Sequence, residues 1–304
     1  MNPCPNEILL QIFEFACDDD GSMGRALSLV SRRFSNLSQE YKFQSIAVMG
    51  LARVVPLAAI LKRLPERNRR IRHLFLSSTG QTAPDTSLCV LKELNYDETW
   101  GAFSELMQLV APTIITCHIV LHTARLVNLV PVSCPNLQSL TLDGPFPTLP
   151  HVYQAAYLPS LRSLTFSSFT NYPVCLFDDI ATQAPRLQKL AFYPSQACRN
   201  LANDLSLALG TPSAASLPTS ESCEYTVPVC TPALPDTLKD ITVQPGTCVD
   251  PSLRNAYCLR SVQGLMRRKL LYMQKQEKRR RVHCIPPGPQ LSVSNSFTTW
   301  LERP

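Results

Sequence analysis

Glycine is scarce in this chain, with 10 residues among 304, and the closest pair is Gly21 and Gly24. The sequence therefore contains neither the GxGxxG turn of dinucleotide-binding folds nor the GxxxxGKS/T loop that surrounds phosphates. It also lacks the HExxH pattern of zinc peptidases and the GxSxG turn of serine hydrolases. No apolar run reaches the length of about 18 residues that a membrane span needs, and the N-terminus lacks the basic start of a signal peptide. We therefore expect a soluble protein of the cytoplasm, the nucleus or both, with no membrane partner.

Motifs for metal binding or catalysis are also missing. The 12 cysteines are scattered and form no CxxC pair, which excludes the spacing of a zinc ribbon. His118 and His122 are four positions apart, but they fall on a predicted strand and its exit, where this spacing does not bring two side chains together. The acidic clusters 18–20 and 178–179 lack partners that would raise a carboxyl pKa for acid–base catalysis. We expect no metal, no cofactor and no enzymatic activity.

The positive charge of the chain is concentrated in one segment. Residues 267–281 hold eight basic residues and one acid, Glu277, whereas the formal net charge of the whole chain is +6, so the remainder is nearly neutral. A nucleic-acid-binding globule spreads its basic patch over the fold, so this distribution argues against a nucleic-acid partner. The segment ends in the cluster Lys278, Arg279, Arg280 and Arg281. This cluster is a nuclear-import signal, an RNA- or membrane-facing patch, or a solvated helix end.

The first 40 residues contain two helical patterns. Pro5 suits the first turn of a helix over residues 5–17, because its missing N–H costs nothing there. The acidic run 18–20 and Gly21 end this pattern, and a second helical segment follows at about 23–37. Helices this short and this apolar need a partner surface, which is either the rest of the chain or another protein.

These two segments together resemble an F-box. The matching strings are Pro5-x-Glu7-Ile8-Leu9-x-x-Ile12-Phe13 and Leu27-x-Leu29-Val30-Ser31-Arg32-Arg33-Phe34-x-x-Leu37. The chain departs from the usual pattern at Ser31, where Cys is common, and at Phe34, where Trp is common. The alternative is that residues 5–37 are ordinary helices of the main domain.

The resemblance is to F-box proteins with degenerate leucine-rich repeats, which are abundant in mushroom-forming fungi. It implies that residues 1–40 form a helical domain that binds a Skp-type adaptor. The residues assigned to this role, either as adaptor contacts or as packing within the domain, are Pro5, Glu7, Ile8, Leu9, Ile12, Phe13, Leu29, Val30 and Phe34.

Residues 41–283 contain a repeated unit, P-x-L-x-x-L-x-L/F, which is complete at 135–142, 159–166 and 185–192. Each unit predicts a short strand with one apolar face, and stacked units cover each other's open edges as in leucine-rich repeats. With looser copies included, the central residues of the predicted strands are Ile46, Leu74, Cys117, Leu140, Leu164, Leu190 and Ile241.

Helices are expected between the strands, at 51–64, 100–110 and 176–184. We therefore predict an α/β fold, with the N-terminal all-helical F-box followed by an irregular leucine-rich-repeat-like solenoid of short parallel strands and helices. The alternative is an α/β domain without repeats. The solenoid is expected to be irregular because the Asn or Cys that usually follows each strand is missing.

The remaining segments differ in character. A Ser/Thr/Pro-rich stretch at about 210–235 is predicted to be a surface insertion. Helical spacing over about 251–281 predicts a terminal helix that caps the last strand. Residues 284–304 are predicted to be a mostly disordered tail, and the alternative is that Phe297, Trp300 and Leu301 dock on the body.

By resemblance, this chain is the substrate-recognition subunit of an SCF-type cullin–RING ubiquitin ligase, which serves ubiquitin-dependent protein degradation. Its partners are then the Skp-type adaptor with the cullin ligase core and a target protein, whose binding residues the sequence does not identify. One alternative is a non-catalytic repeat scaffold or nuclear protein-interaction protein that binds no adaptor. Another is a nuclear or RNA-associated protein led by the basic segment 267–281, which predicts salt-dependent binding to nucleic acid; the nearly neutral remainder of the chain weighs against it. The scaffold alternative predicts that the first helix packs inward and leaves no exposed apolar patch.

Overall fold

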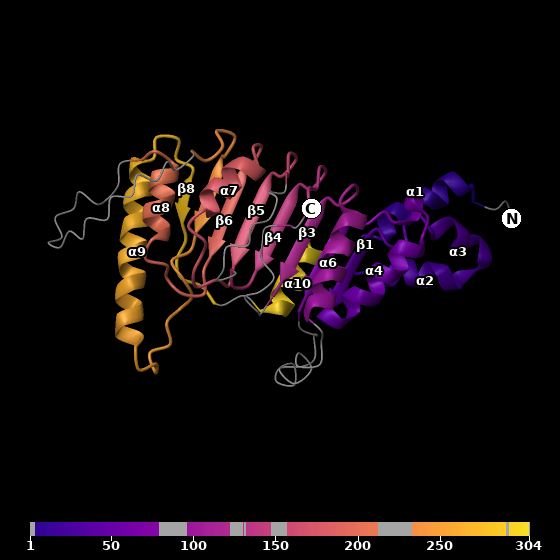
Figure 1. The fold of residues 1–304 in the computed structure, drawn as a ribbon, viewed down its shortest axis with the longest axis horizontal. Helices are drawn as coiled ribbons and strands as arrows, with labels where there is room; N and C mark the ends of the chain where they lie inside the picture. Colours follow the sequence, from indigo (N-terminus) through magenta and orange to yellow (C-terminus); the bar gives the residue numbers. More distant parts are fainter. Residues whose placement is uncertain are drawn as a thin grey trace.

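The computed structural model describes residues 4–78, 96–121, 130, 132–146, 157–211, 233–289 and 292–303. In these ranges the chain is an α/β fold built on one eight-stranded sheet whose strands are all parallel. The strands lie side by side in chain order, from β1 near the N-terminal helices to β8 at the other end (Figure 1). Most of the predicted insertion and His122 lie outside the described residues.

The strands are short and nearly equal in length. Their bounds are β1 Ser45–Met49, β2 His73–Ser77, β3 Thr116–Val120, β4 Ser139–Asp143, β5 Ser163–Ser167, β6 Lys189–Tyr193, β7 Asp240–Val243 and β8 Val282–Cys284. The seven central residues predicted from the sequence are confirmed as strand residues and form one row of partners across the sheet, from Ile46 and Leu74 through to Ile241. Val282 of β8 extends the row by one strand.

Helices cover one face of the sheet and flank its N-terminal end. Their bounds are α1 Asn6–Ala16, α2 Ser22–Val30, α3 Arg32–Ser38, α4 Val54–Arg63, α6 Tyr96–Val110, α7 Leu176–Gln183, α8 Leu201–Ala208, α9 Ala256–Gln276 and α10 Val293–Leu301. Two 3-10 turns, η1 Leu51–Arg53 and η2 Glu66–Asn68, flank α4. The predicted helices at 51–64, 100–110 and 176–184 are therefore confirmed.

The main core lies between the sheet and the helices α4, α6, α7, α8 and α9, whose apolar residues share one buried cluster with the central row of the strands. At the middle of the sheet this core is aromatic. Phe166 stacks on Phe192 with ring centroids 5.5 Å apart, and Phe169 lies 6.3 Å from Phe192. Phe169 follows β5 at the position where leucine-rich repeats usually have Asn or Cys, and it is fully buried. An aromatic cluster thus fills the space between these turns.

The second N-terminal helical segment differs from its prediction, because it is two helices. Ser31 has extended backbone angles between α2 and α3, and its hydroxyl accepts a hydrogen bond from the Phe34 N–H at 3.2 Å. Serine favours such a cap over a helix interior, since its side chain competes for backbone N–H groups.

The C-terminal predictions were wrong in two respects. The helix α9 is shorter than 251–281 and leads into β8, so it connects two strands and does not cap the sheet. The tail expected to be disordered contributes to β8 through Cys284 and forms α10. The helix α10 packs on the face of the sheet opposite to the other helices, where Phe297 and Trp300 meet Phe75.

The turn after β4 requires glycine. Gly144 has φ +137°, and a Cβ atom there would lie 1.9 Å from the carbonyl oxygen of Leu121. By contrast, a Cβ atom at Gly264 in the middle of α9 would meet nothing within 4 Å.

We predict opposite effects for alanine at these two glycines. Gly144→Ala should lower the free energy of unfolding by at least about 2 kcal/mol, because a rigid backbone atom blocks the added methyl group. Gly264→Ala should raise it by up to about 1 kcal/mol, the gain in helix propensity. Urea unfolding followed by circular dichroism measures both, and a neutral Gly144→Ala variant would contradict this account of the turn.

Candidate interaction surfaces

The helices α1, α2 and α3 form a small module beside β1, at one end of the molecule (Figure 1). Its own core consists of Leu9, Phe13, Cys17 and Tyr41, with Leu10, Leu27, Phe34 and Leu37 packed around it. The rings of Phe13 and Phe34 lie 5.2 Å apart. Arg33 on α3 ties down the start of α1 by donating to the Cys4 carbonyl at 2.6 Å and to Asn6 Oδ1 at 2.7 Å.

The opposite face of α1 is apolar and exposed. Ile8, Ile12 and Phe15 follow one line at i, i+4 and i+7, and they are 46%, 51% and 84% exposed. A folded module gains nothing by presenting three large apolar side chains to water. Such a group of side chains is a candidate surface for binding another molecule.

A second exposed apolar group stands at the end of α2, where Leu29 is 86% and Val30 is 63% exposed. The chain then turns at Ser31 into α3, and Arg33 bonds to Asn6 at the start of α1. This bond places the end of α2 and the start of α1 at the same end of the module. We refer to the residues Ile8, Ile12, Phe15, Leu29 and Val30 as the apolar patch.

The structure divides the nine residues that the sequence assigned to the adaptor surface. Pro5, Glu7, Ile8, Ile12, Leu29 and Val30 are exposed and available to a partner. Leu9 and Phe13 are 7% and 1% exposed, and Phe34 packs against them, so their role is packing within the module. Phe15 was missed because its aromatic side chain continues a helical stripe whose exposed side the sequence does not reveal.

The module is joined to the sheet by charged groups. Arg72 pairs with Glu14 of α1 at 2.8 Å, and Gln44 donates to the Glu14 carbonyl at 2.8 Å. Arg303, which follows α10, pairs with Asp18 at 2.6 Å and lies 4.2 Å above the ring of Trp300. Of the acidic cluster 18–20, Asp18 therefore anchors the C-terminus to the module.

Beyond α10, the exposed face of the sheet forms a groove of about 950 Å³. Its floor consists of side chains from β3 to β6 that point away from the core, including Thr116, Ser139, Thr141, Ser163, Thr165 and Lys189. Trp300 and Thr299 of α10 contribute one wall. Arg162, just before β5, adds a second positive charge beside Lys189.

Several residues around this groove carry buried polar atoms that have no hydrogen-bond partner in the part of the chain described here. They are His118 Nε2, Ser167 Oγ, Trp300 Nε1 and Arg303 Nε. An unpaired buried group costs about 1–3 kcal/mol, so these atoms lower the stability of this face; because they are buried, they are not open to a ligand in the groove. The hydroxyls and the cations Arg162 and Lys189 make the groove a surface suited to hydrogen-bonding ligands.

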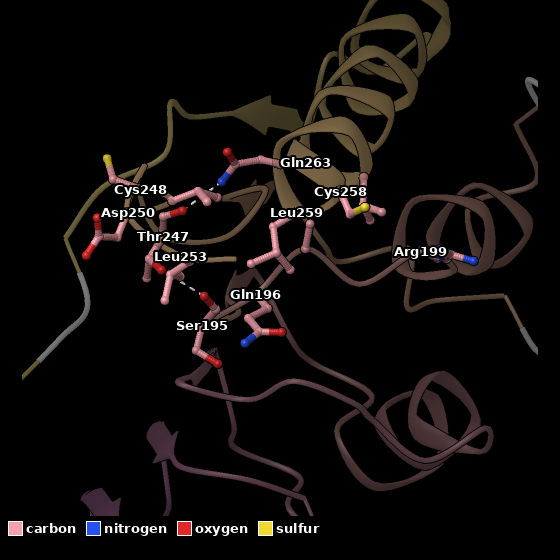
Figure 2. Close-up of a pocket in the computed structure, with 13 residues that line it drawn as sticks. Ser195, Gln196, Arg199, Thr247, Cys248, Asp250, Leu253, Cys258, Leu259 and Gln263 are labelled. Atoms are coloured by element: carbon pink, nitrogen blue, oxygen red, sulfur yellow. Dashed lines mark hydrogen bonds between the residues drawn. The ribbon is translucent and has the colours of Figure 1, made fainter. Parts of the chain in front are cut away.

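A second cavity, of about 600 Å³, lies between the loop after β6, the 247–253 loop and the start of α9 (Figure 2). Gln263 reaches across to the Thr247 carbonyl at 2.7 Å, and the Thr247 hydroxyl donates to the Ser195 carbonyl at 2.8 Å. These bonds hold the walls together. Cys248 and Cys258 are separated in Figure 2, and the described lining includes no histidine that could act as a general base.

Several thiols are unsuited to catalysis. Burial raises the pKa of Cys17 to about 11 and the pKa values of Cys134 and Cys198 to about 12. These thiols are protonated at neutral pH, whereas the thiolate is the reactive form. In the described residues, no group of three or more His, Cys, Asp or Glu side chains could hold a metal ion.

Two arginines of the basic cluster after α9 form ion pairs within the protein. Arg281 is 9% exposed and pairs with Glu277 at 3.1 Å, while its backbone N–H donates to the same carboxylate at 2.8 Å. Arg279 pairs with Asp236 at 3.1 Å in solvent. An import signal made of all four residues would therefore require this turn to open, because the Arg281 side chain faces inward.

Comparison of this chain with protein-family models, curated protein sequences and solved structures finds no match. Among the described residues, no helix combines the length and apolar character needed to cross a membrane. A proposal about function therefore rests on three observations. They are the apolar patch, the groove and the resemblance of residues 5–37 to an F-box.

Two histidines near the contact between α10 and the sheet should make the stability of the fold depend on pH. Burial lowers the pKa of His118 to about 4, although the charge of Asp143 opposes the shift. Burial also lowers the pKa of His73 to about 4; Arg303 and Arg72 lower it too, and Asp18 opposes them. Both groups have an ordinary pKa near 6.5 when the chain is unfolded.

The unfolded chain therefore binds more protons than the folded chain between about pH 6.5 and pH 4, and stability falls as pH falls through this window. His118→Phe should reduce the slope of unfolding free energy against pH by about 1 kcal/mol per pH unit, roughly half of the total from the two histidines. Urea unfolding at pH 4.5, 5.5 and 7.5 measures the slope. An unchanged slope in the variant would show that His118 does not stay neutral in the fold.

Proposed function

We propose that this chain is the substrate-recognition subunit of an SCF-type cullin–RING ubiquitin ligase. In this proposal α1–α3 form an F-box-like module that binds a Skp-type adaptor, and the sheet carries the target. The observation that carries the proposal is the apolar patch, which leaves large side chains exposed on a module whose sequence resembles an F-box.

The patch also weighs against the scaffold alternative. A capping module with no partner would turn its apolar residues toward the sheet, but Phe15 and Leu29 are more than four-fifths exposed. The module is instead attached to the sheet by polar groups, such as the Arg72–Glu14 pair, which leaves its apolar face free.

The arrangement of the sheet supports the second part of the proposal. Strands in chain order, with one apolar row in register, are what an irregular leucine-rich-repeat-like array requires. Aromatic packing around Phe169, in place of an asparagine ladder, accounts for the irregularity. We assign target binding to the groove on the exposed face of the sheet, because it offers hydroxyls, Arg162 and Lys189 on a face that α10 covers only in part.

The proposed mechanism is one of proximity. With the adaptor bound at the patch and the target bound in the groove, transfer of ubiquitin by the other subunits becomes effectively intramolecular. The chain itself contributes affinity and choice of target, and the chemical step belongs to its partners.

Retention on a purified Skp-type adaptor tests the proposal. The intact chain should be retained, and Ile8→Asp/Ile12→Asp should lose retention, because two carboxylates would be buried unpaired in the interface. Since both side chains are exposed, the variant should keep the fold and the melting temperature of the intact chain. Phe13→Asp is unsuitable, because Phe13 is 1% exposed in the core of the module.

The matched control is Val174→Asp, which places a carboxylate at an apolar residue 90% exposed and far along the chain from the patch. It should be retained like the intact chain. Failure of the intact chain to bind the adaptor would contradict the proposal, and equal loss in the Val174→Asp control would show that retention reflects general apolar adhesion.

A further inference from the structure

Residues 254–281, which form α9 and its flanking turns, expose several cations and no acid. Seven of these exposed cations are Arg254, Arg260, Arg267, Arg268, Lys275, Lys278 and Arg280. Within the described ranges none of these seven makes an ion pair or a side-chain hydrogen bond. The one acid between residues 254 and 281 is Glu277, which is buried and paired with Arg281.

These cations are held on a rigid element. The helix has 21 residues, which makes it about 31 Å long. Its apolar residues Met266, Leu270 and Met273 are buried against the body of the protein, so the helix cannot rotate. Figure 1 shows α9 at the end of the molecule opposite to α1–α3.

An exposed aromatic ring lies in the same line as the charges. Tyr257 is 84% exposed, and helical spacing places it on one line with Arg268 and Lys275, which follow at 11 and 18 positions further along. Arg260 follows the ring three positions later on the helix, and Arg254 lies in the turn just before the helix. Gly264 lies on this line as well, with open space where a side chain would stand.

Two other classes of partner fit this face less well. Insertion into a lipid surface needs an outward apolar stripe, but the apolar stripe of α9 is buried. The partly exposed Leu265 and Leu271 are six positions apart and project about 120° from each other, so they form no seam for a partner helix.

We infer that the outer face of α9 binds the phosphate backbone of single-stranded nucleic acid, with Tyr257 stacking on a base. Such binding uses a row of positive charges that follows the phosphate backbone, together with an exposed aromatic ring on which a base stacks. The sequence argued against this partner because it confined the charge to a segment near the tail. The fold places that segment along a helix that spans one end of the protein. This inference does not depend on adaptor binding.

The test is fluorescence anisotropy with a labelled single-stranded RNA of about 20 nucleotides and the full chain, at salt concentrations from about 50 to 200 mM. The logarithm of the association constant should fall linearly with the logarithm of the salt concentration. Arg267→Gln/Arg268→Gln/Lys275→Gln should reduce the slope by about 2, which is the loss of three phosphate contacts, and weaken binding at least about tenfold at low salt. Tyr257→Leu should weaken binding by about fivefold or more with little change in the slope.

The matched control is Arg53→Gln/Arg63→Gln/Arg67→Gln, which removes the same charge from exposed arginines around α4. It should bind RNA within about twofold of the intact chain. Absence of salt-dependent binding, or equal weakening by the control, would overturn the inference. So would binding to phosphatidylserine vesicles or to polyglutamate that is as tight as binding to RNA. Circular dichroism melting checks that every variant is folded.

Discussion

Leu140 of β4 is fully buried because Cys117 and Leu164, its partners on the two neighbouring strands, lie directly beside it and the helices lie above it. The same relation repeats from Ile46 to Val282, so each strand depends on the next for the burial of its central residue. A strand of five residues has no stability alone. The in-register apolar row is therefore the constraint that holds the sheet in chain order and fixes which side chains face out.

The positions of the candidate interaction surfaces follow from this row. Because central residues point toward the helices, the alternate residues, such as Thr141 and Thr165, point to the opposite face and form the floor of the groove. The groove then exists only because α10 stops short of covering that face. On the N-terminal side, the backbone carbonyl of Asp20 accepts a hydrogen bond from the Ala47 N–H of β1 at 3.2 Å. The module thus covers part of the sheet edge without using its apolar patch.

The sequence predicted the strands well because their signal is local: a proline or polar start, then apolar residues at fixed offsets around Leu140, Leu164 and Leu190. It could not predict which face of α1 is buried, because Ile8 and Leu9 belong to two apolar stripes of similar strength. The groove and α10 depend on contacts between distant segments, such as the 2.9 Å hydrogen bond from Ser296 to Asp143 across 153 positions. No periodicity within a short window encodes that contact.

Adaptor binding through the exposed side of the N-terminal module is the central claim. Hydrogen exchange of the full chain, measured with and without a purified Skp-type adaptor, tests it directly at each segment. The account predicts new protection confined to the segments that carry the apolar patch, at about 5–16 and 28–34, with no change in β5 and β6. Unchanged exchange at saturating adaptor, or protection in the groove without protection of α1, would contradict it.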